Sequence, residues 1–428
     1  MHWRKSGWNH DHNRPDHGRI VVFFISKEEI IMNKQAEAEK RNHRKLGQQL
    51  ELFLSMEEAP GMPFFLPKGM ALRNKLEELW KEKHAQAGYD EIKTPIMMKQ
   101  QLWERSGHWD HYHENMYFSE VDDQRYAIKP MSCPGAVLIY NSKLRSYRDL
   151  PLRYAELGLV HRHELSGSLN GLLRVRSFTQ DDAHLFVRED QIEQEVEKVL
   201  HLIDDFYSLF GFSYEVELST RPEDFMGSPA IWDQAEAALE NVLERQGIAY
   251  KVNAGDGAFY GPKIDFHILD SLGRSWQCGT VQLDFQMPEK FGCSYIDQQN
   301  SRKQPIMIHR AIYGSIERFM AILIEHYAGD FPFWLAPVQA SILSISDAHA
   351  EYAKAVGEDL QKAGYRVSVD DRSEKIGLKI REGSQQKVPY LLIVGDKEMQ
   401  DKTVAVRKRP EGNIGEMSLG DLLKQFEV

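Results

Sequence analysis

The sequence predicts two domains of different fold class: an α+β domain built on an antiparallel sheet flanked by helices, then a smaller α/β domain. Between residues 258 and 285, short apolar segments alternate with turns, which is typical of antiparallel strands. After residue 340 the pattern reads strand, helix, strand, helix, strand, which indicates an α/β unit. The proline-rich stretch FPFWLAP, residues 331–337, separates the two patterns and is the expected linker.

The first domain shows helical and extended segments in a clear order. Apolar residues at helical spacing predict a helix over 70–86 that ends at Gly88, and the strand DEIKTPIMM follows with Pro95 inside it. Two strands joined by LSGSLNG are expected within 157–187, and an amphipathic helix follows from Ile192. The stretch MIHRAIYGSIERFMAILIEHYAG predicts the end of a strand and then a helix.

The second domain is predicted from five shorter segments. They are a strand at 340–345, a helix at 349–363, a strand at 365–369, a helix near 374–384 and a strand at 390–394.

Composition excludes several classes of protein. Hydrophobic residues make up 42% of the 428 and aromatic residues 11%, so the chain can form proper cores. The net charge of 53 − 64 = −11 argues against a protein that coats nucleic acid. Three cysteines, Cys133, Cys278 and Cys293, form no disulfide framework and indicate a reducing compartment. The apolar run 20–25 is too short for a membrane helix or a signal peptide.

The N-terminal segment shows neither helical nor strand periodicity. Its histidines could bind a metal opportunistically, but an unstructured tail fits residues 1–31 better. We interpret this segment as an upstream extension and Met32 as the biological start.

One stretch, residues 173–185, gathers unlike polar side chains. If it is extended, alternation places Asp181 on one face and the chemically varied residues on the other. The second face carries Arg174, Arg176, Phe178, Gln180, Asp182 and His184. A solvated strand face is the alternative, but such a face rarely combines Phe, Gln and His with two arginines and no lysine.

These residues indicate an ATP site on a sheet. Arg162 and Glu164 in the preceding strand could face the same cavity, where an arginine can bind phosphate and a glutamate can accept from an exocyclic amine. Phe178 could stack on a purine. Neither GxxxxGK[ST] nor a strand-GxGxxG-helix pattern occurs.

Arg318 is a second indication of anion binding. Ser315 is a natural N-cap for a helix that begins near Ile316, and this puts the cation Arg318 in the first turn, at the positive end of the helix dipole. A bound phosphate would relieve the unfavourable placement; a salt bridge to a nearby carboxylate is the alternative.

A metal site is only weakly indicated by spacing. Cys133, His184 and His309 are the Cys/His set with plausible companions, yet they lie 51 and 125 residues apart (133 to 184 and 184 to 309), unlike a zinc finger. A lone cysteine after a proline-rich turn is more often a buried thiol.

Several of these motifs together carry a resemblance. The segments LGLVHRHELSGSLNGLLRVRSFTQDDAHLF, KPMSCPGAV, GAFYGPKIDF, WQCGTVQLDF and IHRAIYGSIERF resemble the threonyl-tRNA synthetases, a family of class II aminoacyl-tRNA synthetases. The resemblance runs from about Ala38 to the C-terminus. It implies an N-terminal extension at 1–37, a class II catalytic domain at 38–334 and an anticodon-binding domain with a mixed sheet at 335–428.

The resemblance also implies roles for individual residues. The implied zinc ligands are Cys133, His184 and His309. The implied ATP contacts are Arg162, Glu164, Arg174, Phe178, Gln277, Thr280 and Arg318. The implied threonine contacts are Gln180, Asp182 and Tyr260. The implied catalytic residues are Arg162, Lys263, Gln282, Arg318 and His309, the last also assisting near the tRNA ribose. The implied anticodon contacts are Lys375, Arg381, Glu398 and Arg407.

Two positions depart from the family. Ser373 stands where the family usually has Asn, which puts one anticodon contact in doubt, and Asn170 stands where many relatives have His, which could alter recognition of the tRNA acceptor end. Arg176 shares the polar face of the strand without an assignable role. Of the adjacent carboxylates, only Asp182 is expected to face the amino acid, so Asp182 should matter far more for threonine activation than Asp181.

The implied activity is ATP-dependent activation of L-threonine to threonyl-adenylate and its transfer to the 3′ end of tRNA(Thr). It implies one Zn²⁺ per subunit that selects threonine over valine, Mg²⁺ with ATP, a cytoplasmic homodimer and no membrane partner. The N-terminal editing domains of full-length bacterial relatives are expected to be absent, so Ser-tRNA(Thr) would not be cleared in cis, which leaves room for a separate trans-editing factor. The alternatives are a threonine-activating paralogue that loads a carrier protein and a non-catalytic regulatory relative.

Overall fold

The structure, a computed structural model, describes residues 36–427. Residues 1–35 of the predicted extension, including Met32, therefore lie outside the described residues. Within residues 36–427, none of the helices combines the length and apolarity that crossing a membrane requires.

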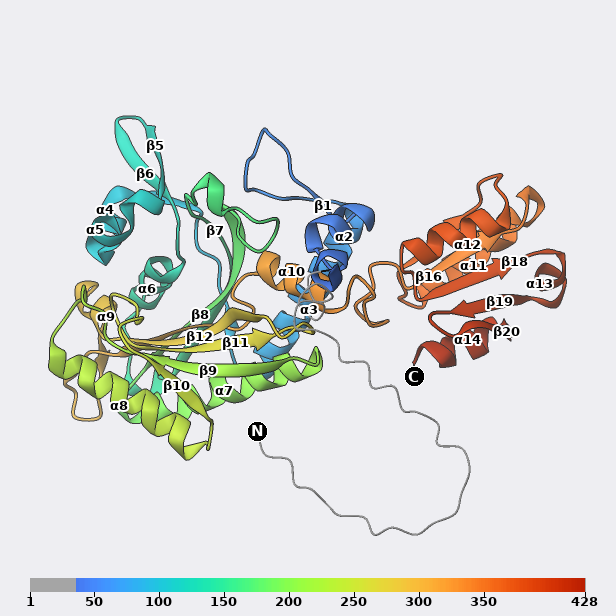
Figure 1. The fold of residues 1–428 in the computed structure, drawn as a ribbon. Coiled ribbons are helices and arrows are strands. Elements are labelled where there is room, and N and C mark those ends of the chain that lie inside the picture. The colour runs from blue at the N-terminus through green and yellow to red at the C-terminus, as the bar shows by residue number, and fades with distance from the viewer. Residues whose placement is uncertain (1–35, 428) are drawn as a thin grey trace, which may run out of the picture.

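The first domain is built on one large sheet (Figure 1), which confirms the predicted antiparallel architecture. Its strand order is β10-β9-β11-β12-β15-β8-β7-β3; the inner pairings are antiparallel, whereas β10 and β3 run parallel to their neighbours at the two edges. The strands are β3 (Asp90–Glu91), β7 (Leu152–His161), β8 (Ser177–Val187), β9 (Ser213–Ser219), β10 (Tyr250–Asn253), β11 (Lys263–Leu269), β12 (Ser275–Asp284) and β15 (Ile306–Ala311).

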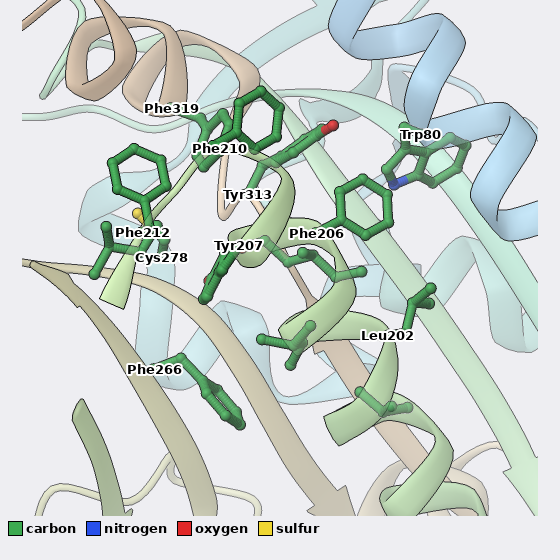
Figure 2. Packing of buried hydrophobic residues seen from close by; sticks show 14 of the residues in the cluster. Trp80, Leu202, Phe206, Tyr207, Phe210, Phe212, Phe266, Cys278, Tyr313 and Phe319 are labelled. Carbon is green, nitrogen blue, oxygen red and sulfur yellow. The ribbon is translucent and has the colours of Figure 1, made fainter. Parts of the chain in front are cut away.

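α6 (Cys133–Asn141) covers part of one face of this sheet, where its Tyr140 stacks on Phe186, and leaves the rest of that face open. Several other helices pack on the opposite face. They include α2 (His43–Gln49), α3 (Pro67–Gln86), α7 (Ile192–Leu209), α8 (Pro229–Arg245) and α10 (Ile316–His326). Figure 2 shows the aromatic core between them, where Phe206 of α7 lies edge-on to Tyr313 with ring centroids 5.3 Å apart. Trp80 of α3 and Phe319 of α10 belong to the same cluster, so this core fixes the start of α10 relative to the sheet.

The predicted strand DEIKTPIMM is wrong as a single element. It forms β3 and then β4 (Met97–Lys99), which belong to different sheets. Pro95 has no N–H to donate, and the N–H of Thr94 donates to the Glu156 carboxylate at 2.9 Å instead of to a neighbouring strand. The chain therefore leaves the large sheet between the two short strands.

Smaller elements complete the first domain. A second sheet joins β4 to the hairpin of β5 (Tyr117–Val121) and β6 (Gln124–Ile128). The remaining ones are β1 (Phe53–Leu54), β2 (Phe64–Phe65), α4 (Gln100–Ser106), α5 (His108–Tyr112), α6 (Cys133–Asn141), α9 (Gln286–Lys290), β13 (Tyr295–Ile296) and β14 (Arg302–Lys303).

The second domain has the predicted mixed sheet, in the order β17-β16-β18-β19-β20. The five predicted segments are confirmed as β16 (Ala340–Ser344), α11 (Ala350–Lys362), β17 (Val367–Asp370), α12 (Ile376–Gln385) and β18 (Tyr390–Val394). The chain then adds α13 (Asp396–Asp401), β19 (Thr403–Lys408), β20 (Gly412–Ser418) and α14 (Leu419–Phe426). The parallel pairs are β16–β17 and β16–β18, whereas β18–β19 and β19–β20 are antiparallel.

Candidate functional site

Two adjoining cavities on the open face of the large sheet form one continuous cleft. Their volumes are about 640 and 390 Å³. Both are lined by Arg162, Gln180, Thr280 and Gln282. We call the larger cavity the arginine end; its further lining includes Glu164, Arg174, Phe178 and Arg318. We call the smaller one the cysteine end; its further lining includes Cys133, Asp182, His184, Tyr260 and His309.

Strand register assembles the middle of this cleft. Along β8, alternation turns Phe178, Gln180, Asp182 and His184 toward it. His184 pairs with His309 of β15, and His309 pairs with Gln282 of β12, so three neighbouring strands contribute side chains at one level. The predicted co-facial set is therefore confirmed from Phe178 to His184.

An irregularity in β12 adjusts which of its side chains reach the cleft. Gln277 pairs with His267 and Gly279 pairs with Phe266, so Cys278 is one extra residue relative to β11. Regular alternation would put Gln277 and Thr280 on opposite faces. The bulge instead allows both to line the arginine end.

The cysteine end brings together the Cys/His set that spacing alone only weakly indicated. One ligand atom each of Cys133, His184 and His309 lies within 4.8 Å of the others, and all three residues are buried. Cys133 reaches the site as the first residue of α6, while the histidines come from β8 and β15.

The donor set fits zinc. Two imidazoles and one thiolate are typical zinc ligands, and a site with three protein ligands keeps a position open. The buried Nδ1 of His184 has no hydrogen-bond partner among the described residues. His309 Nε2 lies 2.9 Å from a carboxylate oxygen of Asp284, the kind of contact that orients a metal-bound histidine.

Burial is the largest cause of the pKa shifts at the cysteine end. It raises the pKa of the Cys133 thiol well above its ordinary value and lowers the pKa of His184 well below its own. Metal binding would favour the thiolate and the neutral imidazole. Burial, and then the neighbouring Glu156 carboxylate, raise the pKa of Asp182 to about 6. Asp181 is different: it faces the other side, where Oδ2 accepts the N–H groups of Ile312 at 2.8 Å and Tyr313 at 2.9 Å.

The arginine end presents cations with unused donors. The Arg162 Nη2 donates to Gln180 at 3.1 Å, and the Arg174 Nε donates to Glu164 at 2.9 Å. Ser315 caps α10 as predicted, because its Oγ accepts the Arg318 N–H at 3.1 Å. Within residues 36–427 Arg318 has no ion-pair partner and its buried Nε has no hydrogen-bond partner, so the salt-bridge alternative finds no support.

The strand predicted over 173–185 starts too early. β8 begins at Ser177, so Arg174 reaches the cleft from the connecting segment, as do Arg162 and Glu164. Arg176 does not line the cleft: its guanidinium donates to the carbonyls of Glu164 at 2.9 Å and Pro60 at 3.2 Å. Its role is therefore to hold this connection, and its predicted place on the polar face is wrong.

Of two further expected residues, Lys263 lies outside the cleft and Tyr260 lines it. Lys263 bridges Asp265 at 2.7 Å and Asp256 at 3.0 Å and is absent from the lining of both cavities. Tyr260 lines the cysteine end and its hydroxyl forms a short hydrogen bond with Gln282.

The four predicted anticodon residues lie in the second domain. Lys375 and Arg381 are exposed at and within α12, and Arg407 is half-buried on β19. None of these three cations forms an ion pair among the described residues. The Glu398 carboxylate already has a partner within its own helix start: it accepts the Gly395 N–H at 2.9 Å in the first turn of α13.

The sequence did not point to two buried residues beside the metal set. They are Asp284 and His108, whose Nε2 lies 3.9 Å from Cys133 Sγ. Burial lowers the pKa of His108 to about 3. No local pattern marks either residue, and only the packing of α5 and β12 brings them to the site.

Comparison with known proteins decides the family. Residues 117–327 match the model of the class II tRNA synthetase core domain (G, H, P, S and T), and residues 339–427 match that of the anticodon-binding domain. The crystal structure of the RNA binding domain of threonyl-tRNA synthetase from Cryptosporidium parvum has a TM-score of 0.87 and 42% identity, covering 90% of this chain and 98% of that one. The chain belongs to the threonine–tRNA ligase family.

Relatives within this family are similar over nearly the whole chain. The threonine–tRNA ligase of Carboxydothermus hydrogenoformans is 60% identical over 95% of this chain, and that of Acetivibrio thermocellus is 62% identical over 94%. The chain spans 65% and 64% of the length of these two ligases.

Proposed function

We propose that the chain activates L-threonine with ATP and transfers it from threonyl-adenylate to the 3′ end of tRNA(Thr). The observation that carries this proposal is the continuous cleft, which joins a zinc-type ligand set to a group of anion-binding arginines through Arg162 and Gln180. An amino acid at the cysteine end would thus present its carboxylate to a nucleotide at the arginine end.

We assign ATP, with Mg²⁺, to the arginine end. Arg162 lies where the two cavities meet and can hold both the α-phosphate and the amino-acid carboxylate. Arg174 and Arg318 can bind the outer phosphates, and Phe178 can stack on adenine beside Glu164. Fixed cations stabilise the charge that develops when the carboxylate attacks the α-phosphorus and pyrophosphate leaves. Gln277 and Thr280 complete the ATP-binding set.

Threonine is assigned to the cysteine end. Cys133, His184 and His309 would hold Zn²⁺, which would supply a Lewis acid for the polar groups of threonine. We assign to Asp182 the role of accepting the hydroxyl proton, with Gln180 and Tyr260 as further contacts, because all three line this cavity.

Two of the expected catalytic roles change in the light of the geometry. One ring nitrogen of His309 faces Asp284, which leaves one nitrogen for a metal and none for proton transfer at the tRNA ribose. We therefore propose only the ligand role for His309. Lys263 is held by two carboxylates and would have to leave one of them to reach a substrate, whereas Gln282 already lines the cleft.

Residues 335–428 are proposed to bind the anticodon of tRNA(Thr), and residues 38–334 to form the catalytic domain. The cations Lys375, Arg381 and Arg407, which form no ion pair within residues 36–427, support this role. We further propose a homodimer acting in the cytoplasm. A groove of about 400 Å³ offers a surface for a second copy. Its lining combines apolar residues with charged and polar ones: Pro63, Phe65, Leu157 and Leu159 with Arg73, Glu77, Ser177, Thr179 and Glu317.

Threonine-dependent exchange between ATP and pyrophosphate tests the activation step, and charging of a tRNA(Thr) transcript tests the transfer. We expect both activities. Exchange without charging would favour the loading of a carrier protein, and loss of both would favour a regulatory relative.

We also propose that this 428-residue polypeptide forms Ser-tRNA(Thr) and does not clear it alone. Serine keeps the hydroxyl and loses one methyl, a difference of only about 1–3 kcal/mol. A deacylation assay with Ser-tRNA(Thr) checks this: rapid hydrolysis by the chain would refute it, whereas slow hydrolysis would make a separate editing factor a partner to look for.

A further inference from the structure

A buried imidazole, His43, lies behind the arginine end of the cleft. Its Nδ1 is 2.7 Å from Glu325 Oε1, and its Nε2 accepts the N–H of Leu172 at 3.1 Å. A nitrogen that accepts an N–H carries no hydrogen, so the ring hydrogen sits on Nδ1 and is donated to Glu325. One neutral ring thus joins α2, α10 and the segment that precedes β8.

The bond to Leu172 holds a tight turn that lines the cleft. The turn closes on itself, since the Leu173 N–H donates to Asn170 at 2.9 Å and the Asn170 N–H donates to Arg174 at 3.1 Å. Asn170, Leu173 and Arg174 all line the arginine end, while His43 is not part of the lining.

The turn and the imidazole are in close contact. Gly171 has φ of +51°, and a Cβ there would lie 2.1 Å from His43 Nε2. A glycine is therefore required at this position both by the backbone conformation and by the space. The turn at 170–174 therefore packs directly against the imidazole ring of His43.

The contacts continue from Glu325 to the opposite wall of the cleft. The second carboxylate oxygen of Glu325 accepts from Arg274, whose Nε lies 2.6 Å from Asp270 Oδ2. Trp276 Nε1 donates to the same Asp270 oxygen at 2.9 Å, and the Arg274 guanidinium lies 5.3 Å from the Trp276 ring centroid. Trp276 lines the arginine end, so these partly buried contacts connect two of its walls.

We propose that His43 is a positioning residue for ATP: it holds the turn at 170–174, and so the Arg174 guanidinium, in the place that nucleotide binding requires. This rests on the proposed function in assigning ATP to the arginine end. Among the described residues His43 has no hydrogen bond or ion pair with a residue of the cysteine end, so its loss should weaken ATP binding and leave threonine binding unchanged.

Two substitutions separate the two bonds of the ring. In His43→Asn the amide reaches only the position of Nδ1, so the contact with Glu325 is kept and the acceptor for Leu172 is lost. In His43→Gln the amide oxygen reaches the position of Nε2 and restores that acceptor. Lys45→Ala, which changes an exposed side chain on the same helix, is the control.

We expect His43→Asn to raise the dissociation constant and KM for ATP about three- to tenfold, as for one lost hydrogen bond. Its KM for threonine should stay within about twofold of the parent, and amide exchange at Leu172 should speed up. His43→Gln should bring the ATP values back toward those of the parent and Lys45→Ala. Gly171→Ala, which displaces the turn and keeps His43, should reproduce the ATP defect.

Unchanged ATP affinity in both His43→Asn and Gly171→Ala would overturn the proposal. So would equal losses for ATP and threonine that follow a lowered Tm, because a purely structural role predicts that result. Calorimetric ATP affinity and amide exchange do not need turnover, so absence of threonine-dependent exchange in the parent would count against the proposed function and leave this test intact.

Discussion

The two ends of the cleft are built in opposite ways. The cysteine end takes His184 and His309 from the middle of the sheet and buries them, whereas the arginine end takes Arg174 from a connecting segment, with 58% of its side chain exposed. Buried groups on strands move little, while exposed arginines can follow a flexible triphosphate. Under the proposed function, the buried end would discriminate between small amino acids and the more exposed end would hold a highly charged nucleotide.

The largest expected effect tests the discrimination at the cysteine end. Valine has the shape of threonine but no hydroxyl, so it would leave Asp182 and the metal without a partner. We expect kcat/KM in pyrophosphate exchange to be roughly 10⁴–10⁵-fold lower for valine than for threonine. Serine should be only about 10–200-fold poorer than threonine. Similar rejection of valine and serine would show that shape rather than the hydroxyl decides.

A second test compares the neighbours Asp181 and Asp182, whose side chains point to opposite faces of β8. Removing Asp182 with Asp182→Ala should lower kcat/KM for threonine about 10–100-fold, as expected for a lost hydrogen bond to a charged group. Asp181→Ala should instead lower Tm and raise KM for ATP, because Asp181 holds the backbone N–H groups of Ile312 and Tyr313 just before α10. Equal losses of threonine activation would contradict the alternation of β8.

A third test concerns the contact behind the metal set. Asp284→Asn keeps the shape of the side chain and removes its charge, which should weaken zinc binding about 10–100-fold. Competition with a chromophoric chelator measures this affinity without turnover. Asp297→Asn, at a half-buried loop carboxylate that also accepts backbone N–H groups, is a matched control. If both variants bind zinc as the parent does, Asp284 does not support the metal site.

The smallest expected effect lies at the arginine end. Ser315→Ala removes the N-cap of α10, which should cost about 0.5–2 kcal/mol of stability. Because Arg318 lies in the first turn, KM for ATP should rise a few-fold while the KM for threonine stays unchanged. Ser315→Asp, which can cap the helix but adds a negative charge near the phosphates, should keep the stability and still weaken ATP binding.

Local patterns predicted those parts of the site that depend on local geometry. Alternation along β8 grouped Phe178, Gln180 and Asp182, and the cap at Ser315 followed from a single residue type at a helix start. Alternation failed at Arg176, which precedes the strand and bonds to backbone carbonyls outside the cleft.

Local sequence patterns could not predict that Cys133, His184 and His309 come together. Cys133 comes from a helix start, and the two histidines come from strands that pair across more than a hundred residues of chain. Only the pairing of β8 with β15 and the position of α6 bring them within 4.8 Å of one another. The same holds for the fold: the βαβαβ part of the second domain was predictable, whereas the break of DEIKTPIMM depended on Glu156, a residue far along the chain.

The extra residue in β12, Cys278, also limits how gene segments can be exchanged between members of this family. A Cβ on Gly314 would lie 2.8 Å from the Cys278 carbonyl oxygen, so the bulge supports the turn that leads into α10. A donor gene segment with one residue fewer would still place Gln277 and Thr280 on one face of the strand, two positions apart, but would withdraw that support. Crossover points for chimeras of this family should therefore lie outside residues 275–284. Within that strand, the number of residues has to be kept as well as their identity.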